Sequence, residues 1–184
     1  MTREPIEAPL RDGKVQAHKA DPQAIDVMEK VMESEGVLLG EEAIRVITNT
    51  KRMDPAPTIS AAQTTIACPG RKRLDNTREG TPGKYEDGDP VHFRLGLIRI
   101  GNIALTSVDA EIFTAIGLKL KAASPPADTL LVTLANGSAN SGYVPNDAAF
   151  GENTFQVLGS RLKPGCAEEG IVNSLVDLIQ ASGK

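Results

Sequence analysis

Aromatic residues are scarce in this chain of 184 residues, and it has no excess of positive charge. It contains no Trp, two Tyr and four Phe, and its formal net charge is −4. So few aromatic rings offer little surface on which nucleic-acid bases could stack, and a negative chain cannot neutralise phosphates. We therefore expect no nucleic-acid partner.

Cysteines and long apolar runs are also few. Cys68 and Cys166 lack the close spacing of a metal motif, and two cysteines alone define no disulfide framework, so the redox compartment stays open. No apolar run approaches the roughly 20 residues of a membrane-spanning helix. The polar start, MTREPIEAPLRDGKVQ, lacks the apolar core of a signal peptide. We expect no transmembrane segment and no signal peptide, which leaves the localisation undetermined.

The chain reads as an arm followed by one domain. Residues 1–20 have no periodicity and contain two prolines and one glycine, which favours an extended N-terminal arm. We predict a single α/β domain over 21–184, long enough to bury roughly two thirds of its unfolded surface. It opens with Asp21 as N-cap and Pro22 at the first helical position, ahead of a covering helix over 22–49.

The next part of the chain carries strand patterns. Alternation over 91–100, a Gly-Asn turn and a second run over 103–108 predict a β-hairpin. A weaker alternation predicts another strand over 58–69. The segment 69–90 is a long charged stretch, and its interpretations are a lid, a docking arm, and a solvated hairpin tip or mobile loop.

A crossover follows the hairpin. An apolar stripe predicts a helix over 110–124, and the apolar run TLLVTLA at 129–135 predicts a strand buried on both faces. With 103–108 these segments form a right-handed βαβ unit with parallel strands. A last helix is predicted over 166–181. The expected fold class is α/β: a layered domain with a mixed β-sheet, in which a central parallel βαβ unit joins an antiparallel hairpin, covered by helices.

Two chemically useful residues follow the ends of the parallel strands, at the edge where open α/β sheets bind ligands. Glu111 lies in the predicted first helical turn behind the N-cap Asp109, and Tyr143 lies in the loop NGSANSGY. A carboxylate and a phenol would share one rim. Structural roles stay open, because a helix dipole favours an acid there and loop tyrosines often bury their rings. The loop amides could also bind an anion. His18 and His92 are not spaced as a metal pair.

Residues 98–150, IRIGNIALTSVDAEIFTAIGLKLKAASPPADTLLVTLANGSANSGYVPNDAAF, resemble the neutral/alkaline (non-lysosomal) ceramidase family and its bacterial ceramidase-like relatives. The likeness rests on Glu-Ile-Phe-Thr, on a helix of the Ile-Gly-Leu-Lys-Leu-Lys type, and on Leu-Ala-Asn-Gly leading to Gly-Tyr-Val-Pro. Less specific similarity extends over 30–180.

Members of that family are zinc amidases that cleave the N-acyl bond of ceramide. Their zinc is held by two histidines from the first half of the catalytic domain and by a Glu and a Tyr from the second. The resemblance implies that Glu111 and Tyr143 are metal ligands, and that Asn136, Gly142 and Phe155 are substrate-binding positions. Two oxygen donors with two imidazoles would leave a position for a water, which zinc ionises near neutral pH.

The chain departs from the family pattern in four features. The loop NGSANSGY is longer than the family's usual Asn-to-Tyr spacing. Neither His18 nor His92 fits the family's histidine motifs, Phe155 stands where members have an active-site tyrosine, and no immunoglobulin-like domain follows the last predicted helix. We therefore expect the second half of a ceramidase-like catalytic domain, inactive alone, which binds zinc only with a His-bearing N-terminal half. The expected partners are that half or a second copy, with a lipid amide as substrate. The alternative is a non-catalytic interaction or oligomerisation module that keeps the fold without a metal site.

Overall fold

The computed structural model describes residues 10–11, 14–15, 21–51, 53–125 and 128–182. The chain divides into two units between Met53 and Asp54. In the first unit, β1 (Leu10–Arg11) pairs antiparallel with β2 (Lys14–Val15). The rest of the predicted arm over 1–20 lies outside the described residues.

Helix α1 (Pro22–Asn49) has the bounds that its sequence pattern predicts. The carboxylate of Asp21 accepts the N–H of Gln23 at 3.0 Å, and Pro22 stands at the first helical position. Every residue of α1 is exposed, so its covering role stays a prediction. Within the described part of the chain, no helix combines the length and apolarity needed to span a membrane.

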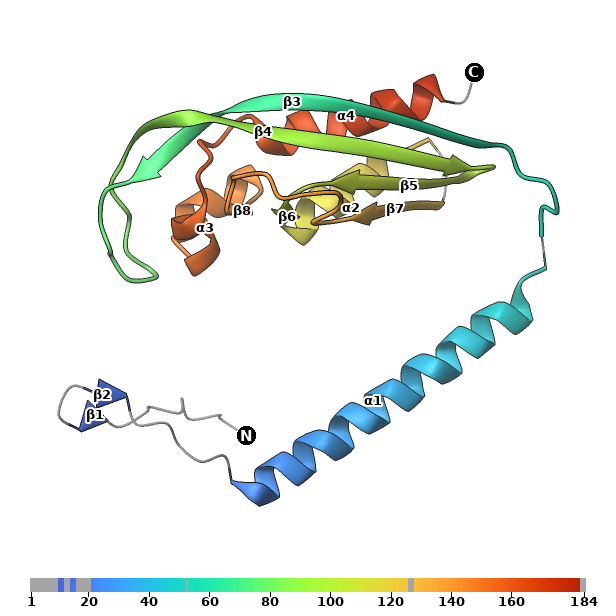
Figure 1. Cartoon of the computed structure of the whole chain (residues 1–184), viewed down its shortest axis with the longest axis horizontal. Helices are drawn as coiled ribbons and strands as arrows, with labels where there is room; N and C mark the ends of the chain where they lie inside the picture. Colours follow the sequence, from blue (N-terminus) through green and yellow to red (C-terminus); the bar gives the residue numbers. More distant parts are fainter. Residues whose placement is uncertain (1–9, 12–13, 16–20, 52, 126–127, 183–184) are drawn as a thin grey trace. The chain divides into compact units, whose positions relative to one another are not determined.

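The second unit is built on a mixed four-stranded sheet in the order β3-β4-β5-β7 (Figure 1). Its antiparallel neighbours are β3 (Ile59–Arg73), β4 (Tyr85–Ile100) and β5 (Ile103–Val108). β7 (Asp128–Val132) runs parallel to β5, as the βαβ interpretation predicts. The predicted hairpin turn joins β4 to β5, and Gly101 adopts φ 55° there.

Helices α2 (Thr114–Ala123) and α4 (Ala167–Ala181) pack against one face of this sheet and against each other. Burial alternates along β4 and β5, so every second side chain enters the core beneath the helices. The largest side chains of that core are fully buried: Phe93, Leu95, Ile116, Leu120, Ile171 and Leu175. The predicted mixed α/β fold class is confirmed.

Side chains on the other face of the sheet are much more exposed. Leu130 and Val132 of β7 are 49% and 50% exposed. The prediction that the run at 129–135 is a strand buried on both faces is wrong. An apolar run alone does not reveal where the helices lie, and here α2 and α4 pack on the same face.

The β3–β4 hairpin continues into the charged segment and extends beyond the other strands (green in Figure 1). Only residues 74–84 connect its two strands. Opposite charges face each other across the extended ladder: Lys72 lies opposite Glu86, and their side-chain N and O atoms lie 3.0 Å apart. The segment 69–90 is therefore the far part of a hairpin, as its hairpin-tip interpretation predicts, and only residues 74–84 form the tip itself.

A disulfide joins Cys68 of β3 to Cys166, the N-cap residue of α4. The two Cα atoms lie 5.7 Å apart, although 98 positions separate the cysteines in the sequence. The bond fastens the start of α4 to the sheet at a point where Cys68 is almost completely buried.

Candidate functional site

Glu111 and Tyr143 are direct neighbours in a short parallel ladder. Past the end of β5 the chain forms β6 (Glu111–Ile112), and past β7 it forms β8 (Tyr143–Val144). The two strands pair in register, with Glu111 opposite Tyr143. Residues opposite each other in a ladder direct their side chains to the same face. The structure thus brings together the carboxylate and the phenol that were expected on one rim.

Glu111 is not part of a helix, contrary to the sequence prediction. α2 begins at Thr114 with Phe113 as its N-cap residue. Asp109 is not a helix cap either: it is 5% exposed, and its Oδ1 accepts the backbone N–H of Arg94 at 2.9 Å. The prediction fails because the residues after β5 use their backbone groups to pair with β8 and with the loop before it.

That loop, between β7 and β8, is fastened to the end of β5 by backbone hydrogen bonds. The N–H of Leu134 donates to the carbonyl of Ala110, that of Ala135 to Val108, and that of Ala139 to Asp109. Leu134 and Asn136 have φ values of 54° and 59°, in the left-handed region that non-glycine residues seldom adopt. Such backbone conformations persist where the surroundings hold the chain, as the hydrogen bonds to the end of β5 do here.

The ring of Tyr143 lies against helix α3 (Phe155–Gly159). Its centroid is 5.8 Å from that of Phe155 in an edge-on contact, and a Cβ on Gly159 would lie 3.6 Å from its Cδ2 atom. Gly142 adopts φ 63°, and a Cβ there would lie 2.3 Å from the carbonyl oxygen of Gly159. Only glycine lets the loop approach α3 so closely. The phenol ring of Tyr143 therefore packs against α3.

The β3–β4 hairpin holds α3 at both ends. At the start of the helix, Oε1 of Glu79 accepts the N–H of Phe155 at 3.1 Å. At its end, Nε of Arg71 donates to the carbonyl of Ser160 at 3.1 Å. The charged hairpin, which the sequence leaves as a lid, an arm or a solvated tip, thus supports the helix on which Tyr143 rests.

A second support joins α4 to the segment after β8. Oε2 of Glu168 accepts the N–H of Asp147, the first residue of the short helix η1 (Asp147–Glu152), at 2.7 Å. Its Oε1 lies 2.9 Å from Nζ of Lys119 on α2. The N–H of Asp147, and after it the ammonium of Lys119, hold the pKa of the Glu168 carboxyl below its usual range.

Two surface hollows flank the Glu111–Tyr143 pair, and both residues line each hollow. The first measures about 450 Å³ and is bounded further by Ile112, Phe113, Thr154 and Gln156. The second measures about 510 Å³ and is bounded further by Leu134, Ser138 and Asn140. Since Glu111 is exposed and Tyr143 half-buried, an ion or a ligand can reach the pair from solvent.

These donors fit part of a metal site. Glu111 offers carboxylate oxygens and Tyr143 a phenol oxygen, but within the described residues no three His, Cys, Asp or Glu side chains converge as a metal-binding group. His92 is an exposed residue of β4, and His18 lies outside the described residues. A catalytic zinc has three protein ligands. The pair can therefore hold an ion only with donors from elsewhere.

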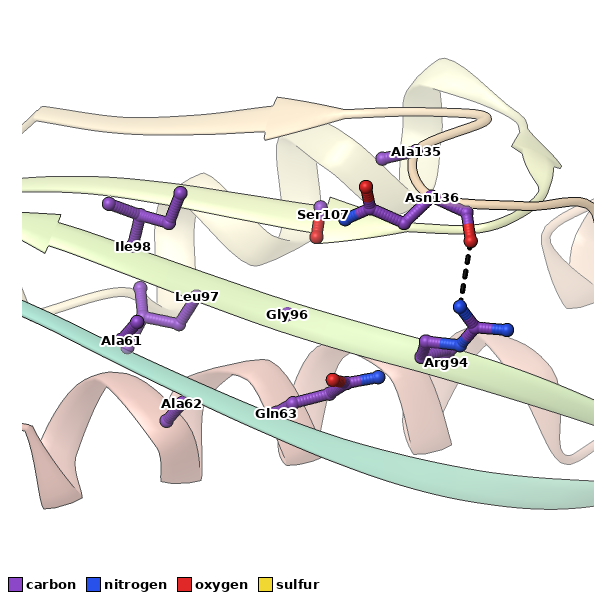
Figure 2. Close-up of a pocket in the computed structure, with 10 residues that line it drawn as sticks. All are labelled: Ala61, Ala62, Gln63, Arg94, Gly96, Leu97, Ile98, Ser107, Ala135 and Asn136. Carbon is purple, nitrogen blue, oxygen red and sulfur yellow. Dashed lines mark hydrogen bonds between the residues drawn. The ribbon is translucent and has the colours of Figure 1, made fainter.

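The three substrate-binding positions implied by the resemblance lie in two places. Gly142 and Phe155 adjoin Tyr143, through the chain and through the ring contact. Asn136 instead lines a separate hollow on the sheet, where its carbonyl accepts a hydrogen bond from Arg94 at 2.7 Å (Figure 2).

Sequence reasoning missed the residues that support the site. Arg71, Glu79 and Glu168 belong to no motif, and each acts through a backbone group of a distant segment. Their only signal is an abundance of charge, which is also typical of an ordinary surface. In comparisons with known proteins, no family model, no curated protein and no solved structure matches the chain.

Proposed function

We propose that this chain contributes Glu111 and Tyr143 to the zinc site of a ceramidase-like amidohydrolase, which hydrolyses the N-acyl bond of ceramide or a related lipid amide. The observation that carries the proposal is the register of β6 and β8, in which the two residues lie opposite each other. The resemblance of 98–150 to the ceramidase family assigns ligand roles to the same two residues. That resemblance rests on sequence motifs alone, so the register is independent support.

The chemistry of the pair suits this role. Carboxylate oxygens are common zinc ligands, and a phenolate oxygen is a hard donor of the same kind. When bound, zinc supplies an ionised water and polarises the amide carbonyl. Glu111 and Tyr143 would hold the ion, and Phe155 restricts the phenol ring through its edge-on contact.

The remaining ligands would come from the His-bearing half of such a catalytic domain. The chain alone would then be inactive, since its site offers two donors. The hollow beside the pair gives apolar contact surface at Ile112 and Phe113, which favours a substrate with hydrocarbon next to its amide.

Ionisation of Tyr143 tests the metal site directly. The chain has two tyrosines, so Tyr143 is its one remaining phenol in Tyr85→Phe, and subtracting the same mixture made with Tyr85→Phe and Tyr143→Phe combined isolates its signal. Near pH 8 an ordinary phenol is protonated. With the His-bearing half present, zinc should raise tyrosinate absorbance in the Tyr85→Phe background, and Glu111→Gln should abolish that rise.

Activity gives the second measurement. Fatty acid release from an N-acyl sphingosine should require both halves and should fall at least a hundredfold in Glu111→Gln or Tyr143→Phe. Glu152→Gln, an exposed acid of η1, is the matched control and should keep full activity. Zinc binding that is unchanged in both ligand variants would overturn the proposal.

A further inference from the structure

The sheet face that points away from α2 and α4, here called the open face, is strongly apolar. Five of its aliphatic side chains are between 41% and 67% exposed: Ile59, Ile98, Ile103, Leu130 and Val132. The ladder register places them on four adjacent strands, all on the same face. A mainly antiparallel sheet can expose one face to water, but its exposed side chains are then usually polar, whereas a contiguous apolar patch is often an interaction site.

The open face has both a hollow and a projection. Figure 2 shows the hollow, of about 340 Å³, over Gly96 between Ala61 and Ser107. A Cβ on Gly96 would lie 2.6 Å from Oγ of Ser107. The absence of a side chain at Gly96 therefore leaves a depression in the surface of the sheet. Ile98 stands beside it as a projecting side chain. A surface that carries both features can be complementary to itself, as a twofold interface requires.

Two opposite charges border the apolar area. Arg94 donates to the Asn136 carbonyl at 2.7 Å (Figure 2), and Asp128 opens β7 opposite Ile103. Neither forms an ion pair within the part of the chain that the structure describes. Arg94 on β4 and Asp128 on β7 are separated by two strand spacings across the sheet and by six residues along the strands. From usual strand dimensions this separation is roughly 20 Å.

We propose that the open face is a homodimer interface, in which two copies pack face to face with Arg94 of each copy opposite Asp128 of the other. A twofold axis in the plane of the interface, passing between Leu105 and Ser107, exchanges the two charged corners. With the residue positions that the strand register gives, this axis also places the ridge formed by Ile103 and Leu105 of one copy over the hollow of the other. Apolar rows then meet apolar rows, and each border charge meets its opposite.

The size of the face predicts a weak dimer. Four strands about 4.8 Å apart and rows spanning about 20 Å give a footprint of roughly 400 Å² per copy. A standard interface buries roughly 800 Å² per partner. We therefore expect dissociation constants in the micromolar to millimolar range. Because the Arg94–Asp128 contacts lie at the rim, dimerisation should also weaken as salt rises.

Charge reversal tests this pairing. Sedimentation equilibrium of the full chain should show a monomer–dimer equilibrium. Arg94→Asp and Asp128→Arg should each weaken it at least tenfold, and the double variant should restore it, because the opposite charges meet again. Lys121→Asp makes the same charge change on an exposed position of α2 and should have no effect. Ile98→Glu, at the centre of the face, should abolish the dimer, and circular dichroism checks that each variant is folded.

Every other outcome overturns the proposal. A chain that stays monomeric at millimolar concentration has no such interface. A dimer that ignores the charge reversals and Ile98→Glu uses another surface. A double variant that stays as weak as the single variants disproves the Arg94–Asp128 pairing. A monomer that binds the His-bearing half through Ile98 assigns the open face to that partner instead. None of these results depends on zinc or on amidase activity, so the proposed function is tested separately.

Discussion

Glu111 and Tyr143 lie opposite each other in the parallel ladder of β6 and β8, although a complete crossover separates them in the sequence. The ladder of β5 and β7 ends at Ser107 and Val132. After it, the segments that follow the two strands pair again for two residues, as β6 and β8. The pairing therefore depends on the loop that precedes Tyr143 and on the helix beneath its ring. Perturbing either should move the phenol while the main sheet stays intact.

Gly142 is the most sensitive position of that loop. Gly142→Ala should destabilise the fold by about 1–3 kcal/mol, because Gly142 has φ 63° and the new Cβ would meet the Gly159 carbonyl. Urea unfolding followed by tyrosine fluorescence measures this, since the chain has no Trp. Gly151→Ala is the control, as a Cβ at Gly151 meets nothing within 4 Å. Equal stability of the two variants would contradict the close approach of the loop to α3.

The hairpin tip should control the mobility of α3. Glu79→Ala removes the acceptor of the Phe155 N–H, an exposed hydrogen bond worth about 0.5–1.5 kcal/mol. Hydrogen exchange at Phe155 and the following amides should accelerate several-fold, while amides of α4 stay protected. Glu86→Ala, which breaks a surface ion pair on the same hairpin, serves as the comparison and should leave α3 unchanged. Unaltered exchange in Glu79→Ala would show that the tip does not support the helix.

Local sequence patterns predict much of the fold, but they do not predict the geometry of the site. The helix over 22–49, the hairpin and the parallel crossover have periodicity, caps and turn residues that act over a few positions. The ladder of Glu111 and Tyr143 has two residues per strand, too few for any pattern, although strand topology alone predicts that the residues share an edge. The exposure of Leu130 depends on where helices pack, which a single apolar run does not encode.

Glu168 should make stability depend on pH in the acidic range. Its folded-state pKa is lowered by the Asp147 N–H and by Lys119, which also pairs with Glu169. A lowered carboxyl pKa contributes stability above the unfolded value of about 4.5, and the contribution is lost as pH falls through the folded value. Glu168→Gln should therefore cost about 1 kcal/mol at neutral pH, and this cost should shrink steadily as the pH falls below 4.5.

Denaturant unfolding of wild type and Glu168→Gln from pH 7 to pH 3 measures that difference. The two stability curves should converge as the pH falls. Glu152→Gln, an exposed η1 residue, should run parallel to wild type throughout. A constant gap between wild type and Glu168→Gln would mean that the carboxylate charge contributes nothing and only packing is lost.

The disulfide should be the largest single contributor to stability among these features. Joining Cys68 to Cys166 closes a loop of about 100 residues, for which the chain-entropy estimate is about 4–5 kcal/mol. That is a large share of the roughly 5–15 kcal/mol typical of a domain. A reductant, or the double replacement Cys68→Ser and Cys166→Ser, should therefore shift the urea midpoint strongly downward. The double variant must not respond further to reductant, and a wild-type midpoint that is equal with and without reductant would rule out this contribution.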